Sequence, residues 1–167
     1  LEVPSGYWRN VDQAWREAQG RDGGWGYSAG DDRSYGSMTA AGAATLYITS
    51  DYLHANRQRD LQTPYRNEPL DRAINWLGKN YAVDHNPGRD APIVQVDEDQ
   101  PERSELEQLE RMLGRLQGRR NRGNWFIHYM LFSYERVGEA SGLTRFGQTK
   151  WFDRGSRFLL RNQNYDG

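Results

Sequence analysis

The chain has 167 residues, which suggests a single domain, and its 22 Lys and Arg residues nearly balance its 23 Asp and Glu residues. This balance gives no electrostatic reason to expect a nucleic-acid partner. The chain has no cysteine, which excludes disulfides, thiolate zinc ligands and cysteine nucleophiles, and no apolar run reaches the roughly 20 residues that span a bilayer.

The first part of the chain is typical of helices separated by a glycine-rich turn. Residues 7–19 are predicted to form an amphipathic helix, because apolar residues recur at spacings of three and four: Trp8, Val11 and Trp15. Residues 20–27 are rich in glycine and include an Asp-Gly step, which predicts a structured turn. A second helix is predicted over residues 38–53, with Ser37 as its N-cap and with small residues at 40–44 that allow close packing.

A third helix and a charged segment follow. Residues 70–81 are predicted to be an amphipathic helix that ends before the turn at 86–88, and its apolar positions are Leu70, Ala73, Ile74 and Leu77. Residues 89–123 are strongly charged, so we expect a surface insertion there, with one charged helix over 104–117.

The last part of the chain contains two more predicted helices. Residues 125–137 are apolar on every side, which predicts a helix enclosed by protein and ended by Gly138 and Gly142. Residues 151–163 form the last predicted helix. No segment alternates between apolar and polar residues in the way that a half-buried strand does, so we predict an all-α protein.

One motif occurs at two of the predicted helix ends. The first copy consists of Trp15, Gln19, Gly23 and Trp25, and the second consists of Leu159, Gln163 and Gly167, after which the chain ends. This spacing resembles the QW repeat of squalene-hopene and oxidosqualene cyclases. The segment Asp-Gly-Gly-Trp-Gly-Tyr at 22–27 is similar to units of the wider prenyltransferase and squalene-cyclase repeat group.

The resemblance implies an α/α toroid, in which inner and outer helices alternate around a ring. By this interpretation the helices at 38–53 and 125–137 are inner ones, and the outer ones are at 7–19, 70–81 and 151–163. The expected organisation is an incomplete arc, with the first repeats at 1–88, the insertion at 89–123 and a further repeat at 124–167.

The second copy of the motif stops inside its turn, so we expect the chain to be a piece of a longer repeat protein. The inner helix faces would then lack some of their neighbours. Large exposed apolar surfaces promote association, so self-association is predicted.

The motif residues have a structural interpretation. A glutamine amide can satisfy backbone groups left unpaired at a helix end, and the tryptophan indole can cover it from water. The sequence therefore predicts that Gln19 and Trp25, and the corresponding Gln163, stabilise corners between helices rather than take part in chemistry.

The reaction that the resemblance implies lacks its recognisable residues here. A class II cyclase would use an Asp-x-Asp-Asp acid, and the nearest match, 97–99, lies in the hydrophilic insertion, where desolvation does not raise a carboxyl pKa. A zinc prenyltransferase site needs a cysteine, and the histidines show no ligand spacing: His54, His85 and His128. We therefore expect no metal and no cofactor.

Four residues are candidates for lining a pocket at the mouth of the predicted ring. They are Trp125, His128 and Tyr129, at the start of the predicted enclosed helix, and Asp32, in the loop before the helix at 38–53. Each also has a plain interpretation, which is core packing for the aromatic and histidine side chains and a loop role for the carboxylate.

Three functions stay open on the sequence. The first is a cyclase-like repeat domain whose aromatic cavity takes an apolar small molecule. The second is a non-catalytic module that binds protein or a ligand. The third is a toroid that binds or processes glycans, although hydrolysis would need paired carboxylates and Asp31-Asp32 is the only pair near the expected mouth.

Overall fold

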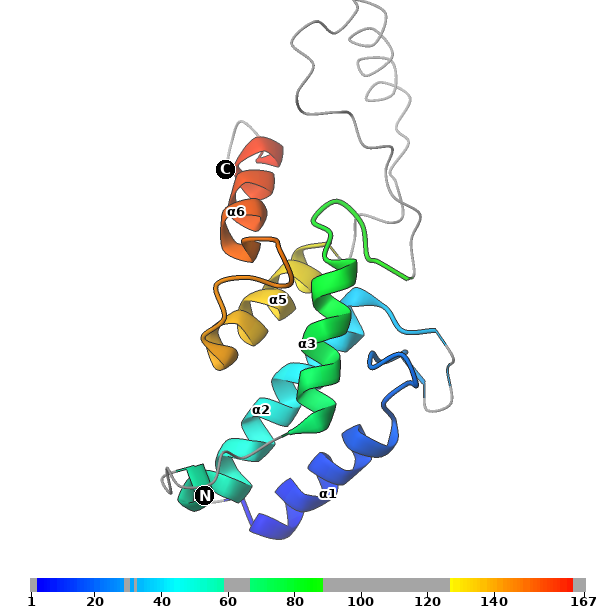
Figure 1. Ribbon diagram of the computed structural model, residues 1–167, viewed down its shortest axis with the longest axis vertical. Helices are drawn as coiled ribbons and strands as arrows, with labels where there is room; N and C mark the ends of the chain where they lie inside the picture. Colours follow the sequence, from blue (N-terminus) through cyan, green and yellow to red (C-terminus); the bar gives the residue numbers. More distant parts are fainter. Residues whose placement is uncertain (1–2, 29–30, 32, 59–66, 89–126, 164–167) are drawn as a thin grey trace, which may run out of the picture.

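The computed structural model describes residues 3–28, 31, 33–58, 67–88 and 127–163. Within these residues the protein is all-α, as predicted, and the only β-type pairing is an isolated bridge between Phe146 and Thr149. The helices are α1 (Ser5–Glu17), α2 (Gly36–Gln58), α3 (Glu68–Asn80), α5 (Ile127–Ser141) and α6 (Trp151–Asn162) (Figure 1). The predicted insertion at 89–123 lies outside the described residues.

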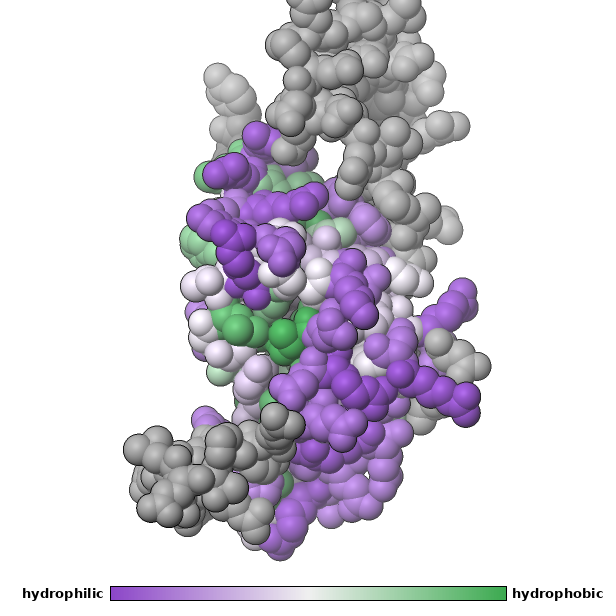
Figure 2. Space-filling view, in the orientation of Figure 1, coloured by the Kyte–Doolittle hydropathy of each residue, from purple (hydrophilic) through white to green (hydrophobic). Residues whose placement is uncertain are grey.

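Helix α2 is the centre of the packing. Helices α1, α3 and α5 all pack against it, whereas α6 packs mainly against α5, away from α1 (Figure 1). The core between these helices combines small residues of α2 with large side chains from its neighbours, among them Ala40, Ala43, Leu46, Leu77, Met130 and Tyr134. Figure 2 shows a hydrophilic surface over α1 and α3, and hydrophobic residues exposed around α5.

The small residues of α2 allow the close approach that the sequence predicts. A Cβ atom added to Gly42 would lie 2.6 Å from Cδ2 of Trp25, whose side chain is 1% exposed. Ala40 and Ala43, on the same helix, are fully buried. Only a glycine at position 42 leaves room for the indole, so the turn at 20–27 can pack directly on the α2 backbone.

The predicted N-cap of α2 is wrong. The helix already begins at Gly36, which places Ser37 in its first turn. The Ser37 backbone N–H donates to Oδ1 of Asn86 at 3.0 Å, and Nδ2 of Asn86 donates to the Ser37 hydroxyl at 2.9 Å. The cap therefore comes from a residue distant in sequence, a contact that no local pattern reveals.

Helix α5 differs from the prediction in two respects. Gly138 does not end the helix but lies within it, where its missing side chain leaves room for the Trp151 indole. The helix ends at Ser141, and Gly142 follows with a positive φ of 66°. Nor is the helix enclosed, because Tyr129 and Phe132 are 51% and 53% exposed, so only one face of it is buried.

Candidate functional site

The residues of the first motif lie together at the corner between α1 and α3. The Trp25 indole Nε1 donates to the Trp15 carbonyl oxygen at 2.8 Å, so the indole satisfies a carbonyl near the C-terminal end of α1. Gln19 Nε2 donates to two carbonyl oxygens, those of Gly23 and Pro69, at 2.8 Å each. Gly23 has a φ of 94°, a conformation that favours glycine.

Gln19 and Trp25 both bond backbone carbonyl groups, but they do so in other positions than the sequence led us to expect. We expected the glutamine to satisfy the helix end and the indole to cover it. Instead the indole of Trp25 binds the end of α1, and the amide of Gln19 joins the turn to the start of α3. The motif thus holds α1, the start of α3 and the turn at 20–27 in one arrangement.

Asp22 is a second anchor of this turn. Its Oδ1 accepts hydrogen bonds from the Ser34 hydroxyl at 2.7 Å and from the Gly24 N–H at 3.1 Å, and its Oδ2 accepts one from Trp76 Nε1 at 2.9 Å. Burial by itself raises the pKa of this carboxyl group, but these hydrogen bonds outweigh it and leave the pKa below its usual value.

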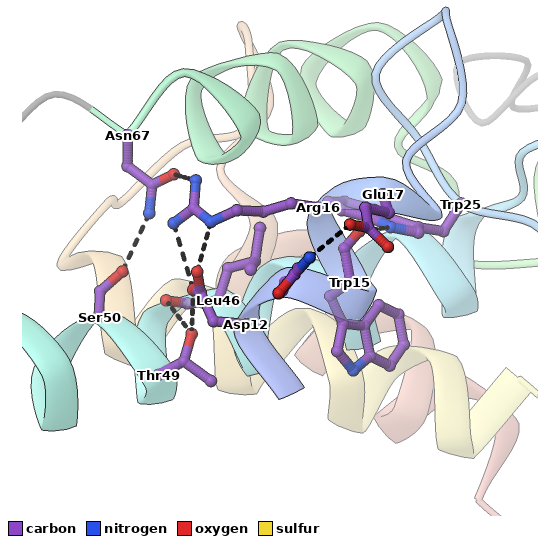
Figure 3. Close-up of polar contacts among 10 residues, drawn as sticks. Asp12, Trp15, Arg16, Glu17, Trp25, Leu46, Thr49, Ser50 and Asn67 are labelled. Atoms are coloured by element: carbon purple, nitrogen blue, oxygen red, sulfur yellow. Dashed lines mark hydrogen bonds and ion pairs between the residues drawn. The ribbon is translucent and has the colours of Figure 1, made fainter. Parts of the chain in front are cut away.

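A polar network connects α1, α2 and the start of α3 (Figure 3). Nε of Arg16 bonds Oδ2 of Asp12 at 2.5 Å, and Nη1 of Arg16 donates to Oδ1 of Asn67 at 3.0 Å. On α2, the Thr49 hydroxyl donates to Asp12 at 2.7 Å and the Ser50 hydroxyl accepts from Asn67 at 3.0 Å. The members bind one another, so we assign this network to stability rather than to chemistry.

The second copy of the motif is described only in part. Gln163 is exposed and follows the end of α6, and Gly167 lies outside the described residues. The equivalence of Gln19 and Gln163 therefore stays a prediction.

A half-open hollow of about 290 Å³ lies between α5 and α6. The described residues that line it are mostly aromatic or aliphatic: Tyr81, His128, Leu131, Phe132, Tyr134, Glu135, Trp151, Phe152, Gly155, Ser156 and Leu159. On each helix they recur every three or four residues, which places them on one face. The hollow is near the lower end of the usual volume of ligand pockets, roughly 300 Å³.

The base of the hollow is held by a cluster of aromatic rings. The rings of Tyr81 and Tyr134 have centroids 4.9 Å apart, and Phe146 stacks on Trp151 at 5.9 Å with an angle of 23° between the ring planes. The Tyr81 hydroxyl donates to the Trp151 carbonyl oxygen at 2.8 Å, which ties the end of α3 to the start of α6. These contacts hold the aromatic lining residues Tyr81, Tyr134 and Trp151 in place in the absence of a ligand.

The two tyrosines of this cluster stay neutral. Burial raises the pKa of Tyr81 to about 12, although the nearby Arg154 guanidinium opposes the shift. Burial, and next the neighbouring Tyr81, raise the pKa of Tyr134 still further. The Tyr134 hydroxyl has no hydrogen-bond partner among the described residues, and it faces Gly36, where a Cβ atom would collide with it.

Among the predicted pocket residues, His128 lines this hollow but is exposed, so the interpretation of it as a buried core histidine is wrong. Tyr129, the next residue of α5, is also exposed and is not among the described lining residues. Trp125 and Asp32 lie outside the described residues.

Sequence reasoning missed most of the lining residues, including Phe132, Glu135 and Phe152. A signal was present, because His128, Leu131, Phe132 and Glu135 follow the 3–4–7 spacing of one helix face. The sequence does not reveal which helix faces this stripe across the gap.

The other described acidic and histidine side chains that were considered for catalysis do not gather at one site. Asp31 is exposed and accepts the Arg33 N–H at 3.2 Å, while His85 Nδ1 lies 2.8 Å from Asp84 Oδ1. The carboxylates at 97–99 lie outside the described residues. In the part of the chain that is described, no three His, Asp or Glu side chains gather in the manner of a metal site.

None of the described helices combines the length and the apolar character that crossing a membrane requires.

Comparison with family models, with curated proteins and with solved structures found no match to this chain.

Proposed function

We propose that the chain is a helical-repeat domain that binds an apolar small molecule in the hollow between α5 and α6. The observation that carries the proposal is the hollow itself, which is half-open, about 290 Å³ in volume and walled by aromatic side chains. A concave apolar site with a few polar groups at its edge is the usual form of a small-molecule site.

The packing order is consistent with the toroid that the resemblance implies. Helix α2 packs against α5, as two neighbouring inner helices would, and α1 and α3 also pack against α2, as outer helices would. The α6 helix contacts α5, although less extensively than α1 and α3 contact α2. We therefore propose that these helices form an arc of the terpenoid-cyclase and prenyltransferase type.

Binding is favoured over glycan hydrolysis by the residues at the hollow. Glycoside hydrolysis ordinarily uses two carboxyl groups placed on either side of the bond that is cleaved. Of the described lining residues, Glu135 is the one that carries a carboxylate. Aromatic walls without a paired acid and base suit a ligand that is held rather than cleaved.

A titration with the neutral apolar fluorophore N-phenyl-1-naphthylamine tests the proposal, with Gly155→Leu as the variant that fills the hollow. A Cβ atom at position 155 meets only ordinary contacts, 3.6 Å from the Tyr81 hydroxyl and 3.9 Å from a Leu131 methyl group, so the variant is expected to fold. We expect at least about a tenfold loss of affinity, or about 1.4 kcal/mol.

The matched control is Gly6→Leu, since Gly6 is also helical and has nothing within 4 Å of an added Cβ atom. This variant should bind the fluorophore as the unaltered protein does. Equal binding by the Gly155→Leu and unaltered proteins, with both folded by circular dichroism, would rule out the hollow as the site.

A further inference from the structure

We infer that the hollow between α5 and α6 selects an organic cation, a quaternary or primary ammonium group carried on an apolar scaffold. This inference rests on the proposed function and names the class of ligand for the same site. It depends on two features of the lining, the arrangement of the aromatic rings and the position of the single carboxylate.

The aromatic rings form a corner. The rings of Trp151 and Phe152 have centroids 5.7 Å apart and planes at 90°, so two ring systems meet at a right angle along the hollow. The Phe132 ring lines it from α5. An aromatic ring attracts an ammonium group that lies over its face, because the face carries partial negative charge.

Glu135 supplies the charge that a cation requires. It lies on α5, one position beyond Tyr134, and is half-buried at the hollow. Of the described lining residues it is the only one that carries a carboxylate. A carboxylate beside aromatic faces favours a cation over a neutral molecule of equal shape.

The protein already places one of its own cations on this set of rings. The Arg136 guanidinium carbon lies 5.1 Å from the centroid of the Phe132 ring. The same guanidinium group bonds Oε2 of Glu139 at 3.0 Å, which offsets its positive charge near the hollow. One face of the Phe132 ring thus already holds a cation of the protein itself, which shows that this ring attracts one.

The test uses two probes of the same size and shape, choline and its uncharged analogue 3,3-dimethyl-1-butanol, with binding followed by NMR chemical-shift changes in the full chain. We expect choline to bind about fivefold to thirtyfold more tightly, which is the range of cation–aromatic attraction in partly desolvated sites.

Two variants assign the selectivity to the named residues. Glu135→Gln should remove most of the preference for choline and leave binding of the alcohol unchanged. Phe152→Leu keeps an apolar side chain but removes one ring of the corner, so it should also lower the preference. Glu17→Gln makes the same chemical change as the first variant on α1, outside the lining, and should have no effect.

Each outcome decides the inference. A preference for choline that Glu135→Gln and Phe152→Leu both reduce supports it. Equal affinity for the two probes overturns it but leaves the apolar site in place. A failure of both probes to bind also overturns it, and the fluorophore titration then shows whether the proposed function fails as well.

Discussion

Asp22 shows how one side chain fixes the local structure of a turn. Its two carboxylate oxygens accept hydrogen bonds from Ser34 and Gly24, in the connection between α1 and α2, and from Trp76 in α3. An asparagine has the same shape but only one acceptor oxygen, so one end of the side chain would direct an N–H₂ group at another donor. The ionised carboxylate is therefore required by the hydrogen bonds rather than by any reaction.

We predict that Asp22→Asn lowers the free energy of unfolding by about 1–2 kcal/mol at pH 7, because a donor in the turn loses its partner. Urea unfolding measures this loss. The control is Asp31→Asn, since Asp31 is exposed and its carboxylate accepts the backbone N–H of Arg33, which the amide oxygen of an asparagine can also accept. That change should alter stability by less than about 0.5 kcal/mol. A similar loss in both variants would contradict the role of Asp22.

The stability difference between the unaltered protein and Asp22→Asn should also depend on pH. The pKa of Asp22 in the folded state is below the ordinary value of an aspartate, so its stabilising effect is present above that ordinary value and is lost as the pH falls through the folded-state pKa. The difference in unfolding free energy between the unaltered protein and Asp22→Asn should accordingly shrink below about pH 4. A difference that grows in acid would show that the sign of the pKa shift is wrong.

Two tryptophan side chains pack directly on the backbone of a helix where that helix has a glycine. Trp25 rests on α2 at Gly42, and Trp151 rests on α5 at Gly138. Glycine weakens a helix by about 1 kcal/mol relative to alanine, so its presence at these positions indicates a packing requirement. Gly6 has no such role, because an added Cβ atom there would have nothing within 4 Å.

At the scale of the helix, we predict opposite effects for two glycine-to-alanine changes. Gly42→Ala should destabilise the protein, because the added methyl group lies 2.6 Å from a buried indole atom and overpacking costs about 1–3 kcal/mol. Gly6→Ala should leave stability unchanged or raise it by up to about 1 kcal/mol. Thermal unfolding of both variants distinguishes the two effects, and a stabilised Gly42→Ala protein would show that Trp25 can move away.

Over the described part of the molecule, α6 is a helix that exposes several large apolar side chains. None of its residues is buried, and Phe152, Leu159 and Leu160 are 61%, 42% and 72% exposed. Its polar side carries Arg154, Arg157 and Arg161, so the helix is strongly amphipathic. Such a face promotes association with another apolar surface.

We predict concentration-dependent self-association that Leu160→Glu weakens, because a charge placed on the apolar face opposes its burial. Sedimentation velocity over a wide concentration range measures it. Tyr27→Glu is the matched control, since Tyr27 is 79% exposed but lies in the turn that precedes α2. A monomer at every concentration would contradict the prediction.

The sequence by itself determined the helices and the first corner. The spacing of Trp8, Val11 and Trp15 gives α1 its apolar face, and the Gln19 to Trp25 motif predicts the turn, because these signals depend on residues near one another in the chain. The small side chains at 40–44 predicted close packing for the same reason.

The tertiary structure alone decided which surfaces meet. Ser37 was predicted to cap α2, but Asn86 does so from a distant loop, and the helix at 125–137 was predicted to be enclosed, but one of its faces is exposed. The hollow and its Glu135 also arise from the meeting of α5 with α6. Helical periodicity shows that a face is apolar, whereas only packing determines whether another helix, a ligand or solvent covers it.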